Sequence, residues 1–215
     1  MAATKSSDIL SIYMDNVLEN EKFPLSVYKF CKENKIEEQD FYKQYASLDT
    51  LKHQVWKVFF ENTMQVLHKN SDYPSMTRKD RLLTFYFTFF EVLLLNRSYV
   101  LFALKGTESP MKAIAQLKHL RVNFKEFATE LIEEGNDDKT LSLVKHPVSL
   151  FSEAAWSQLL FILKFWLDDT SPAFEKTDAA IEKSITVAFD VFDNTQLEAL
   201  MDLGKFLWKE KFSKN

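Results

Sequence analysis

Apolar residues recur along most of this chain at the three- and four-residue spacing of amphipathic helices. The first such pattern runs from Ile9 to Leu18 and stops at Glu21 to Pro24, because proline disfavours helix at the residue before it. A short second pattern, Val27 to Cys31, is predicted to begin either with Ser26 as its N-terminal cap or with Pro24 as its first residue. Two short helices are therefore predicted before residue 34.

The next patterns are a third short helix and a longer one. The third helix is predicted to hold Phe41, Tyr42 and Tyr45, after a turn at Asn34 and Lys35. From Leu51 the apolar spacing continues for about five turns, until Asn and Pro residues break it before residue 75.

Five longer helical patterns follow, separated by turns rich in Gly, Pro, Asp and Asn. They cover roughly Thr77 to Lys105, Pro110 to Glu134, Val148 to Leu167, Pro172 to Phe192 and Thr195 to Phe212. The whole chain has 20 Phe but only 3 Gly and 5 Pro, too few for the tight turns of a many-stranded sheet. We therefore expect an all-α fold.

Charge and cysteine content narrow the function classes. With 27 basic and 31 acidic residues the net charge is −4, so any contact with nucleic acid has to be local. A single cysteine, Cys31, is typical of a reducing compartment. Met1 to Asp8 has no signal-peptide pattern, and the most apolar stretch, Leu82 to Leu95, is shorter than the roughly 20 residues of a membrane span. A cytoplasmic protein without a membrane span is expected.

The stretch from Lys35 to Leu51 resembles the end of the helix-turn-helix of TetR-family transcriptional regulators. The resemblance lies in the pair Phe41-Tyr42 and in the segment that starts at Tyr45. It covers about residues 8 to 60, because Val27, Phe30 and Cys31 fall where that family has Val, Ile and Ala. We therefore expect a TetR-like fold, with a three-helix head on a larger helical-bundle body.

The resemblance also implies a domain organisation. Residues 1–52 would form the helix-turn-helix head, and a fourth helix from about residue 51 would link it to the rest. Residues 53–215 would form a domain that binds a small molecule and dimerises.

A few head residues are suited to contact double-stranded DNA. Gln39 can read a base edge, and phosphate contacts are expected from Ser26, Tyr42, Lys43 and Lys52.

Several departures from the family pattern favour the alternative that the head has lost DNA binding. Lys35 stands at the turn glycine, where a left-handed backbone costs roughly 1 kcal/mol more than in glycine. Leu48 replaces a lysine, and the recognition helix begins with Glu37, Glu38 and Asp40. Residues 1 to 60 hold eight basic and nine acidic side chains, and no arginine precedes Arg78.

In the body, Thr84 to Leu95 and Val148 to Leu167 are apolar on nearly every face, which indicates central helices. Such aromatic-rich helices either interlock as a dense core or leave a lined cavity. The family resemblance favours a cavity for an apolar molecule or lipid. The candidate lining residues are Phe85, Tyr86, Phe89, Phe90, Arg97, Phe124, Phe127, Trp156 and Phe161. A buried Arg97 would favour an acidic head group, whereas a solvent-facing or Glu91-paired Arg97 would have no such role.

The last two patterns carry apolar stripes typical of a four-helix homodimer interface. The candidate interface residues are Ile181, Ile185, Phe189, Leu197, Leu200, Met201, Gly204 and Trp208. Alternatively, both stripes cover the body of their own chain.

No enzyme activity, cofactor or metal is expected. His53, His68, His119 and His146 lack a second metal-binding residue at a ligand-like spacing, and His53 faces only Asp49 on its own helix. The glycines are too few for a phosphate-binding loop.

Two functions remain, beside a purely structural dimer. The first is a TetR-like DNA-binding regulator that responds to a small apolar ligand. The second is a lipid- or quinone-like ligand carrier with a vestigial head. It is suggested by Trp166 to Pro172, followed by Phe174, Glu175 and Thr177, which resembles part of the TetR-fold lipid-binding protein of ubiquinone biosynthesis.

Overall fold

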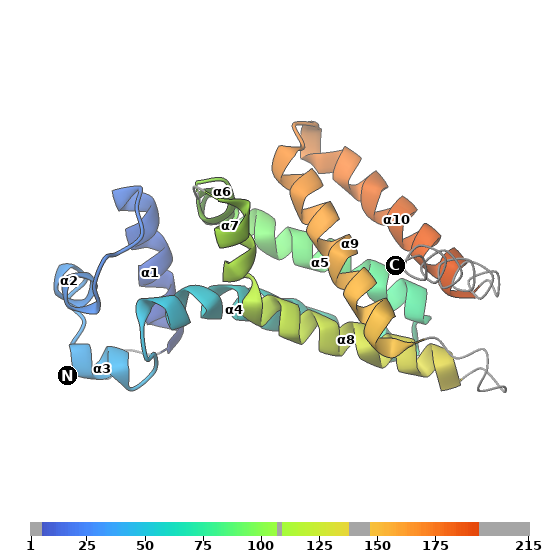
Figure 1. The fold of residues 1–215 in the computed structure, drawn as a ribbon, viewed down its shortest axis with the longest axis horizontal. Coiled ribbons are helices and arrows are strands. Elements are labelled where there is room, and N and C mark those ends of the chain that lie inside the picture. Colours follow the sequence, from blue (N-terminus) through green and yellow to red (C-terminus); the bar gives the residue numbers. More distant parts are fainter. Residues whose placement is uncertain (1–5, 107–108, 138–146, 194–215) are drawn as a thin grey trace, which may run out of the picture. The chain divides into compact units, whose positions relative to one another are not determined.

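The computed structural model describes residues 6–106, 109–137 and 147–193, and every regular element in these ranges is a helix (Figure 1). The elements in chain order are α1 (Ser6–Asn20), α2 (Val27–Glu33), α3 (Glu38–Tyr42), α4 (Leu48–His68), the 3-10 helix η1 (Tyr73–Ser75), α5 (Arg78–Leu95), α6 (Arg97–Lys105), α7 (Pro110–Gln116), α8 (Lys118–Asp137), α9 (Val148–Asp168), the 3-10 helix η3 (Pro172–Phe174) and α10 (Glu175–Asp193). The prediction of an all-α fold is confirmed. The last predicted helix, Thr195 to Phe212, lies outside the described residues.

The chain divides into two compact units. The first takes its described residues from 1–71 and 87–126, and the second from 72–86 and 127–215. The helices α5 and α8 therefore each contribute residues to both units. The three head helices, within residues 1–52, lie entirely in the first unit.

In the first unit α1 packs against α4 and α6, and α2 packs against α3. Three fully buried rings form the centre of the head: Phe30 contacts Tyr13 at 6.0 Å and Phe41 at 6.1 Å between ring centroids. Burying such rings supplies most of the stabilisation available to helices this short, which are marginal in isolation. The turn between α2 and α3 places Lys35 at φ 56°, the left-handed backbone expected at this position.

The third head helix is shorter than the sequence predicts. It ends at Tyr42, so Tyr45 lies beyond it and not within it as expected. Tyr45 is nevertheless buried, its amide donates to the carbonyl of Phe41, and their rings lie 5.8 Å apart. The apolar spacing continues because the chain still turns after Tyr42, where the amides of Gln44 and Tyr45 both donate to the carbonyl of Phe41.

Two long predicted helices are each broken into two. Thr77 to Lys105 forms α5 and α6, whose axes bend by 90° at Asn96. The Asn96 side chain donates to the carbonyl of Val92 at 2.9 Å, a local bond that competes with helix continuation. The pattern from Pro110 likewise breaks, at Leu117. Apolar periodicity survives both breaks, which is why it did not reveal them.

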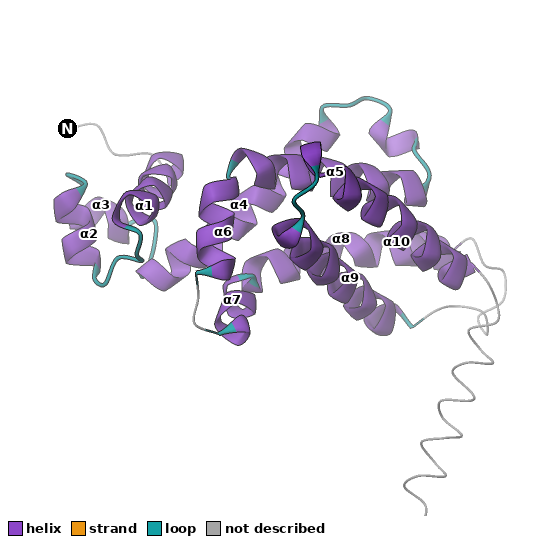
Figure 2. Cartoon of the chain, turned by 90° about the horizontal axis from the view of Figure 1, so that it is seen from above, coloured by secondary structure: helices purple, strands orange, loops and turns teal. Residues whose placement is uncertain are grey.

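In the second unit α9 and α10 form an antiparallel hairpin, visible side by side in Figures 1 and 2. The corner is held by Asp169, whose carboxylate accepts hydrogen bonds from the amides and hydroxyls of both Ser171 and Thr177, at 2.6 to 2.9 Å. The bonds from Ser171 and Thr177 hold the pKa of this carboxyl well below its usual range, against the opposing effect of burial. Ala173 and Phe174 take left-handed backbone angles to complete the turn, and the Phe174 ring packs on Trp166 at 5.9 Å.

α9 is also the one described helix whose own length and apolar composition would suit a membrane span, with 28% of its most apolar window buried. Length and apolar composition alone are weak evidence for a membrane span, because the core helices of soluble proteins meet the same criterion.

Candidate nucleic-acid interface and ligand cavity

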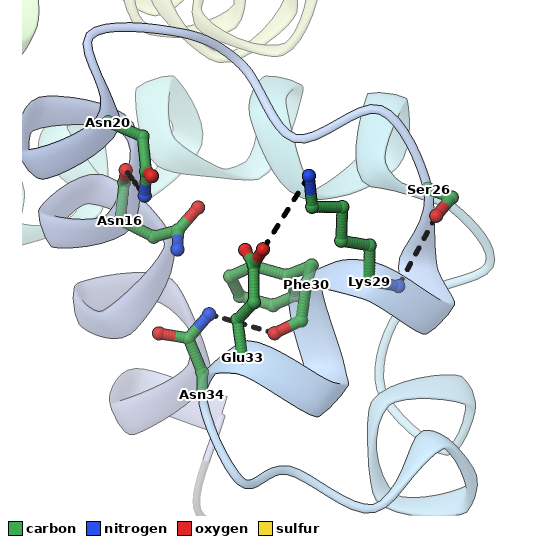
Figure 3. A network of polar contacts seen from close by, with 7 residues as sticks. All are labelled: Asn16, Asn20, Ser26, Lys29, Phe30, Glu33 and Asn34. Carbon is green, nitrogen blue, oxygen red and sulfur yellow. Dashed lines mark hydrogen bonds and ion pairs between the residues drawn. The ribbon is translucent and has the colours of Figure 1, made fainter.

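The N-terminus of α2 is capped by Ser26, one of the two predicted helix starts, and the helix does not begin at Pro24. The Ser26 Oγ accepts a hydrogen bond from the amide of Lys29 at 3.2 Å (Figure 3). At the other end of α2 the side chain of Asn34 donates to the carbonyl of Phe30 at 2.8 Å. A hydroxyl that accepts at a cap still has its own proton to donate, so the exposed Ser26 is able to bind an anion in front of α2.

In α3, the two neighbouring rings Phe41 and Tyr42 differ in burial. Phe41 is fully buried, whereas Tyr42 is 54% exposed and Gln39 is exposed as well. The helix thus fixes itself to the head through one ring and presents an amide and a phenol to solvent.

The lysines predicted to contact phosphate already have intrachain partners. Lys43 Nζ lies 2.8 Å from Asp40 Oδ1, and Lys52 Nζ lies 4.2 Å from the centroid of the Phe23 ring. Lys52 also lies 4.0 Å from the carboxylate of Asp49. These contacts reduce the positive potential that the head offers to a phosphate backbone.

Cys31 is buried, and burial together with the nearby Glu38 raises the pKa of its thiol to about 11, which suits inert packing.

Two histidines from different helices lie close together. The ring of His53 in α4 lies 5.4 Å from that of His119 in α8, between centroids. Burial first, and then His53 and two lysines, lower the pKa of His119. No signal in the sequence pairs two histidines this far apart.

The second unit contains an apolar cavity of about 270 Å³, bordered by α5, α8, α9 and α10. Its larger lining side chains are Leu82, Leu131, Ile132, Phe151, Phe189 and Phe192. Alanines at positions 128, 154, 155 and 188 also line it, and their small side chains leave the space that larger residues would fill.

Three polar side chains border this cavity. The Gln158 amide donates to the Ser184 hydroxyl at 3.0 Å, which links α9 to α10. The guanidinium of Arg78 lies over the ring of Phe192, with 5.5 Å from Cζ to the ring centroid. Gly135 makes this possible, since a Cβ there would lie only 1.9 Å from Arg78 Nη1 and 2.7 Å from the Phe192 ring.

None of the nine predicted ligand-binding residues lines this cavity. Eight lie elsewhere: Phe85, Tyr86, Phe89, Phe90, Phe124, Phe127 and Trp156 are buried, and Arg97 is half-buried at the start of α6. Phe161 is 59% exposed and borders a second hollow with Phe165 and Lys164. Some of the buried rings stack closely, such as Phe85 and Phe127 at 4.8 Å between centroids. A role for any of the nine in ligand binding stays a prediction.

Of the predicted dimer residues, Ile181 and Ile185 are fully buried within their own chain. Phe189 is half-buried and lines the cavity. The other five, Leu197, Leu200, Met201, Gly204 and Trp208, lie outside the described residues. The large apolar side chains that α9 and α10 expose are different ones: Leu150, Phe161, Phe165, Val187 and Val191. The apolar periodicity identified the stripes. It could not show which of their residues are buried within the chain and which are exposed to solvent.

Within residues 6–106, 109–137 and 147–193, no three His, Cys, Asp or Glu side chains gather as a metal site.

Comparison with known proteins agrees with the helical architecture. The family model described as "Tetracyclin repressor-like, C-terminal domain" matches residues 81–207, more than half of the chain. None of the curated proteins matches.

Two solved structures share the fold. One, named as a TetR-family transcriptional regulator from Syntrophomonas wolfei str. Goettingen, is 17% identical, with a TM-score of 0.60 over 87% of this chain and 94% of the other. The second, named as a TetR-family transcription regulator from Shewanella sp. PV-4, is 14% identical, with a TM-score of 0.54 over 86% of this chain and 93% of the other.

Proposed function

The chain belongs to the TetR family, and from this premise we propose that it is a transcription regulator whose head binds DNA and whose body senses a small apolar molecule. The observation that carries the proposal is that α3 buries one side chain in the head core and exposes others to solvent. Phe41 anchors the helix in the head core, and this leaves Gln39 and Tyr42 accessible to a partner. An amide that reads adenine and a phenol that binds phosphate are residue types suited to a major-groove helix.

Homodimerisation is part of the proposal. The exposed hydrocarbon side chains of α9, among them Leu150 and Phe161, support it, because a second copy would remove them from water. A twofold dimer would present two heads to successive major grooves, roughly 34 Å apart on one face of the duplex. The operator would then be a near-palindrome, and the protein would act in the cytoplasm.

The α9–α10 cavity is the site we assign to the ligand. Its walls are hydrocarbon with a few polar groups at the edge, the usual make-up of a small-molecule site. Two of its bordering helices, α5 and α8, contribute to both compact units. A ligand that displaces either helix would therefore change the unit that includes the head, and shift the population of DNA-binding conformations.

Fluorescence anisotropy with DNA from the promoter region of the protein's own gene tests the proposal. We expect nanomolar affinity that weakens steeply with salt. The Gln39→Ala variant should lose about 1–3 kcal/mol on the cognate site and relax specificity at one position. Tyr42→Phe should weaken all sequences alike, and Gln65→Ala, an exposed glutamine on α4, is the matched control.

A second function is favoured by the charges of the head, namely a carrier of lipid- or quinone-like ligands that does not bind DNA. Glu38 and Asp40 lie in the first turn of α3, and Lys43 is paired with Asp40. Micromolar binding that is blind to sequence would assign this function in place of the regulator. Native mass spectrometry of protein purified from its host should show a retained apolar molecule in either case.

A further inference from the structure

Resting on the proposed ligand-sensing function, we propose that the α9–α10 cavity selects an uncharged alcohol, whose hydroxyl donates a hydrogen bond to the side-chain carbonyl of Gln158. The hydrocarbon part of the ligand lies against the apolar walls formed by α5, α8, α9 and α10. The ligand class is therefore a neutral alcohol of medium size, as distinct from an ether or a fatty acid.

The first argument is the composition of the walls. Of the described residues that line the cavity, all carry hydrocarbon side chains except Arg78, Gln158 and Ser184. Transfer of an alkyl chain from water to such walls is favourable, whereas every polar group of a ligand has to find a partner there. The walls therefore suit a ligand with a large hydrocarbon part and very few polar atoms.

The second argument is the orientation of the Gln158 amide. The Ser184 hydroxyl donates its single proton to the carbonyl of Ile181, at 3.1 Å. Its oxygen can then only accept a hydrogen bond from Gln158, whose Nε2 lies 3.0 Å away. The amide nitrogen therefore faces Ser184, and the carbonyl oxygen Oε1 lies on the other side of the amide group.

The carbonyl oxygen of Gln158 is the acceptor that a ligand can use. Gln158 is half-buried, and no residue in the described part of the chain donates to its Oε1. A site built around such an acceptor favours a ligand hydroxyl, because a ligand without a donor leaves the oxygen unpaired in apolar surroundings. An ether or a carboxylate brings only acceptors to this oxygen, so neither can make the bond.

Arg78 does not reverse this preference. Its guanidinium lies over the ring of Phe192 and has a further partner within the chain. A carboxylate would have to compete with these contacts and would also lose its hydration between apolar walls. A neutral ligand loses far less hydration when it enters the same space.

The third argument is size. A cavity of about 270 Å³ is slightly smaller than the roughly 300–1,000 Å³ that is usual for small-molecule sites. Such a volume suits one alkyl chain of medium length better than a large polycyclic ligand. Alanines on both arms of the hairpin, such as Ala155 and Ala188, provide this space, so a larger side chain at either position would occupy the site of the alkyl chain.

Isothermal titration calorimetry with three ligands of similar size tests the inference. Octan-1-ol carries one donor, its isomer heptyl methyl ether carries an acceptor and no donor, and octanoate carries a negative charge. We expect octan-1-ol to bind the full-length protein about tenfold more tightly than the ether, and octanoate to bind more weakly than octan-1-ol. Equal affinities for the alcohol and the ether, or tighter binding of octanoate, would overturn the proposed selectivity.

Variants then assign the selectivity to its residue. Gln158→Leu removes the acceptor at similar volume, so it should lose about tenfold in octan-1-ol affinity and keep its affinity for the ether. Ser184→Ala removes the group that orients the amide and should lower the preference for the alcohol. Its matched control is Ser157→Ala, because Ser157 also donates to a carbonyl of its own helix, at 2.9 Å, but does not line the cavity. An unchanged preference in Gln158→Leu would show that the inference is wrong.

Two further variants test the cavity itself, with circular dichroism to check folding. Ala155→Leu and Ala188→Trp each fill part of the cavity from a different arm of the hairpin, and should weaken octan-1-ol and the ether alike. Undiminished binding of both ligands by either folded variant would overturn the site.

The same samples enter the DNA-binding assay, so the two proposals can fail separately. Preference for octan-1-ol without specific DNA binding would overturn the regulator and leave the alcohol-selective cavity. Specific DNA binding without binding of octan-1-ol or the ether would overturn the cavity as the sensor site.

Discussion

The head and the α9–α10 hairpin both expose large side chains, but side chains of different chemistry. In the head, Tyr28 and Tyr42 are 60% and 54% exposed, and each carries a hydroxyl on its ring. In the hairpin, Phe161 and Val187 are 59% and 61% exposed, and they are pure hydrocarbon. A tyrosine ring can pack against a partner while its hydroxyl bonds to a hydrated, charged surface. Exposed hydrocarbon side chains are stabilised only by another apolar surface or ligand. The comparison therefore predicts a polar partner for one region and an apolar partner for the other.

The largest expected difference is in the loss of stability when one aromatic ring is truncated to alanine in each region. Phe41→Ala removes a fully buried ring that contacts Phe30, and should cost about 3–5 kcal/mol of the head's stability. Phe161→Ala removes an exposed ring and should change the free energy of unfolding by less than about 0.5 kcal/mol at low protein concentration. Urea denaturation and amide exchange in α1 to α3 measure both effects. Equal losses would mean that the two rings are equally packed, contrary to their exposures.

Substitution of Asp169 at the corner between α9 and α10 should also lower the stability of the protein. Asp169→Asn keeps one carbonyl acceptor but places an amide against donors from Ser171 or Thr177, so the melting temperature should fall by several degrees at neutral pH. The folded state lowers the pKa of Asp169, so its stabilisation is complete above the ordinary carboxyl pKa, about 3.9, and is lost as the pH falls further. The difference in melting temperature between the two proteins should therefore shrink below pH 4. A difference that persists at low pH would show that the carboxylate is not its source.

Charging the exposed face of α9 tests its apolar partner. Phe161→Glu combined with Phe165→Glu should raise the dimer dissociation constant at least tenfold, since two carboxylates would be buried in the interface. Ile114→Glu, at an exposed apolar residue of α7, is the control and should leave association unchanged. Analytical ultracentrifugation measures all three proteins, and an unaltered double variant would place the dimer surface elsewhere.

The smallest effect concerns the head turn. Lys35→Gly relieves a left-handed backbone at φ 56°, and should stabilise the head by about 0.5–1 kcal/mol after the greater chain entropy of glycine is subtracted. Asn34→Gly, at φ −99°, has no strain to relieve and should destabilise. A loss of stability in Lys35→Gly would mean that the lysine side chain contributes more than its backbone costs.

Much of the helical architecture could be predicted from the sequence. The Ser26 cap, the Phe41-Tyr42 pair and the all-helical body follow from local chemistry, which a single sequence carries. The break at Asn96 was missed because apolar spacing continues through it.

The cavity was missed for a different reason. Small residues from three helices line it, Ala128 on α8, Ala154 and Ala155 on α9 and Ala188 on α10, whereas the expected lining residues were mostly large rings. Large rings fill space and small residues leave it open, so a search for rings identifies the core and not the void. Tertiary packing decides where small residues from distant segments meet, so the pattern along the sequence did not reveal the cavity.

The Asp169 corner also has a kinetic consequence for ligand exchange. It holds the α9–α10 pair at one end, while Phe151 and Phe192, which border the cavity, lie toward the opposite ends of the two helices and contact each other at 5.3 Å. Separation of the two arms is therefore easiest at the cavity, and the corner acts as a pivot. Residues at the pivot should therefore set how fast a ligand enters and leaves the cavity.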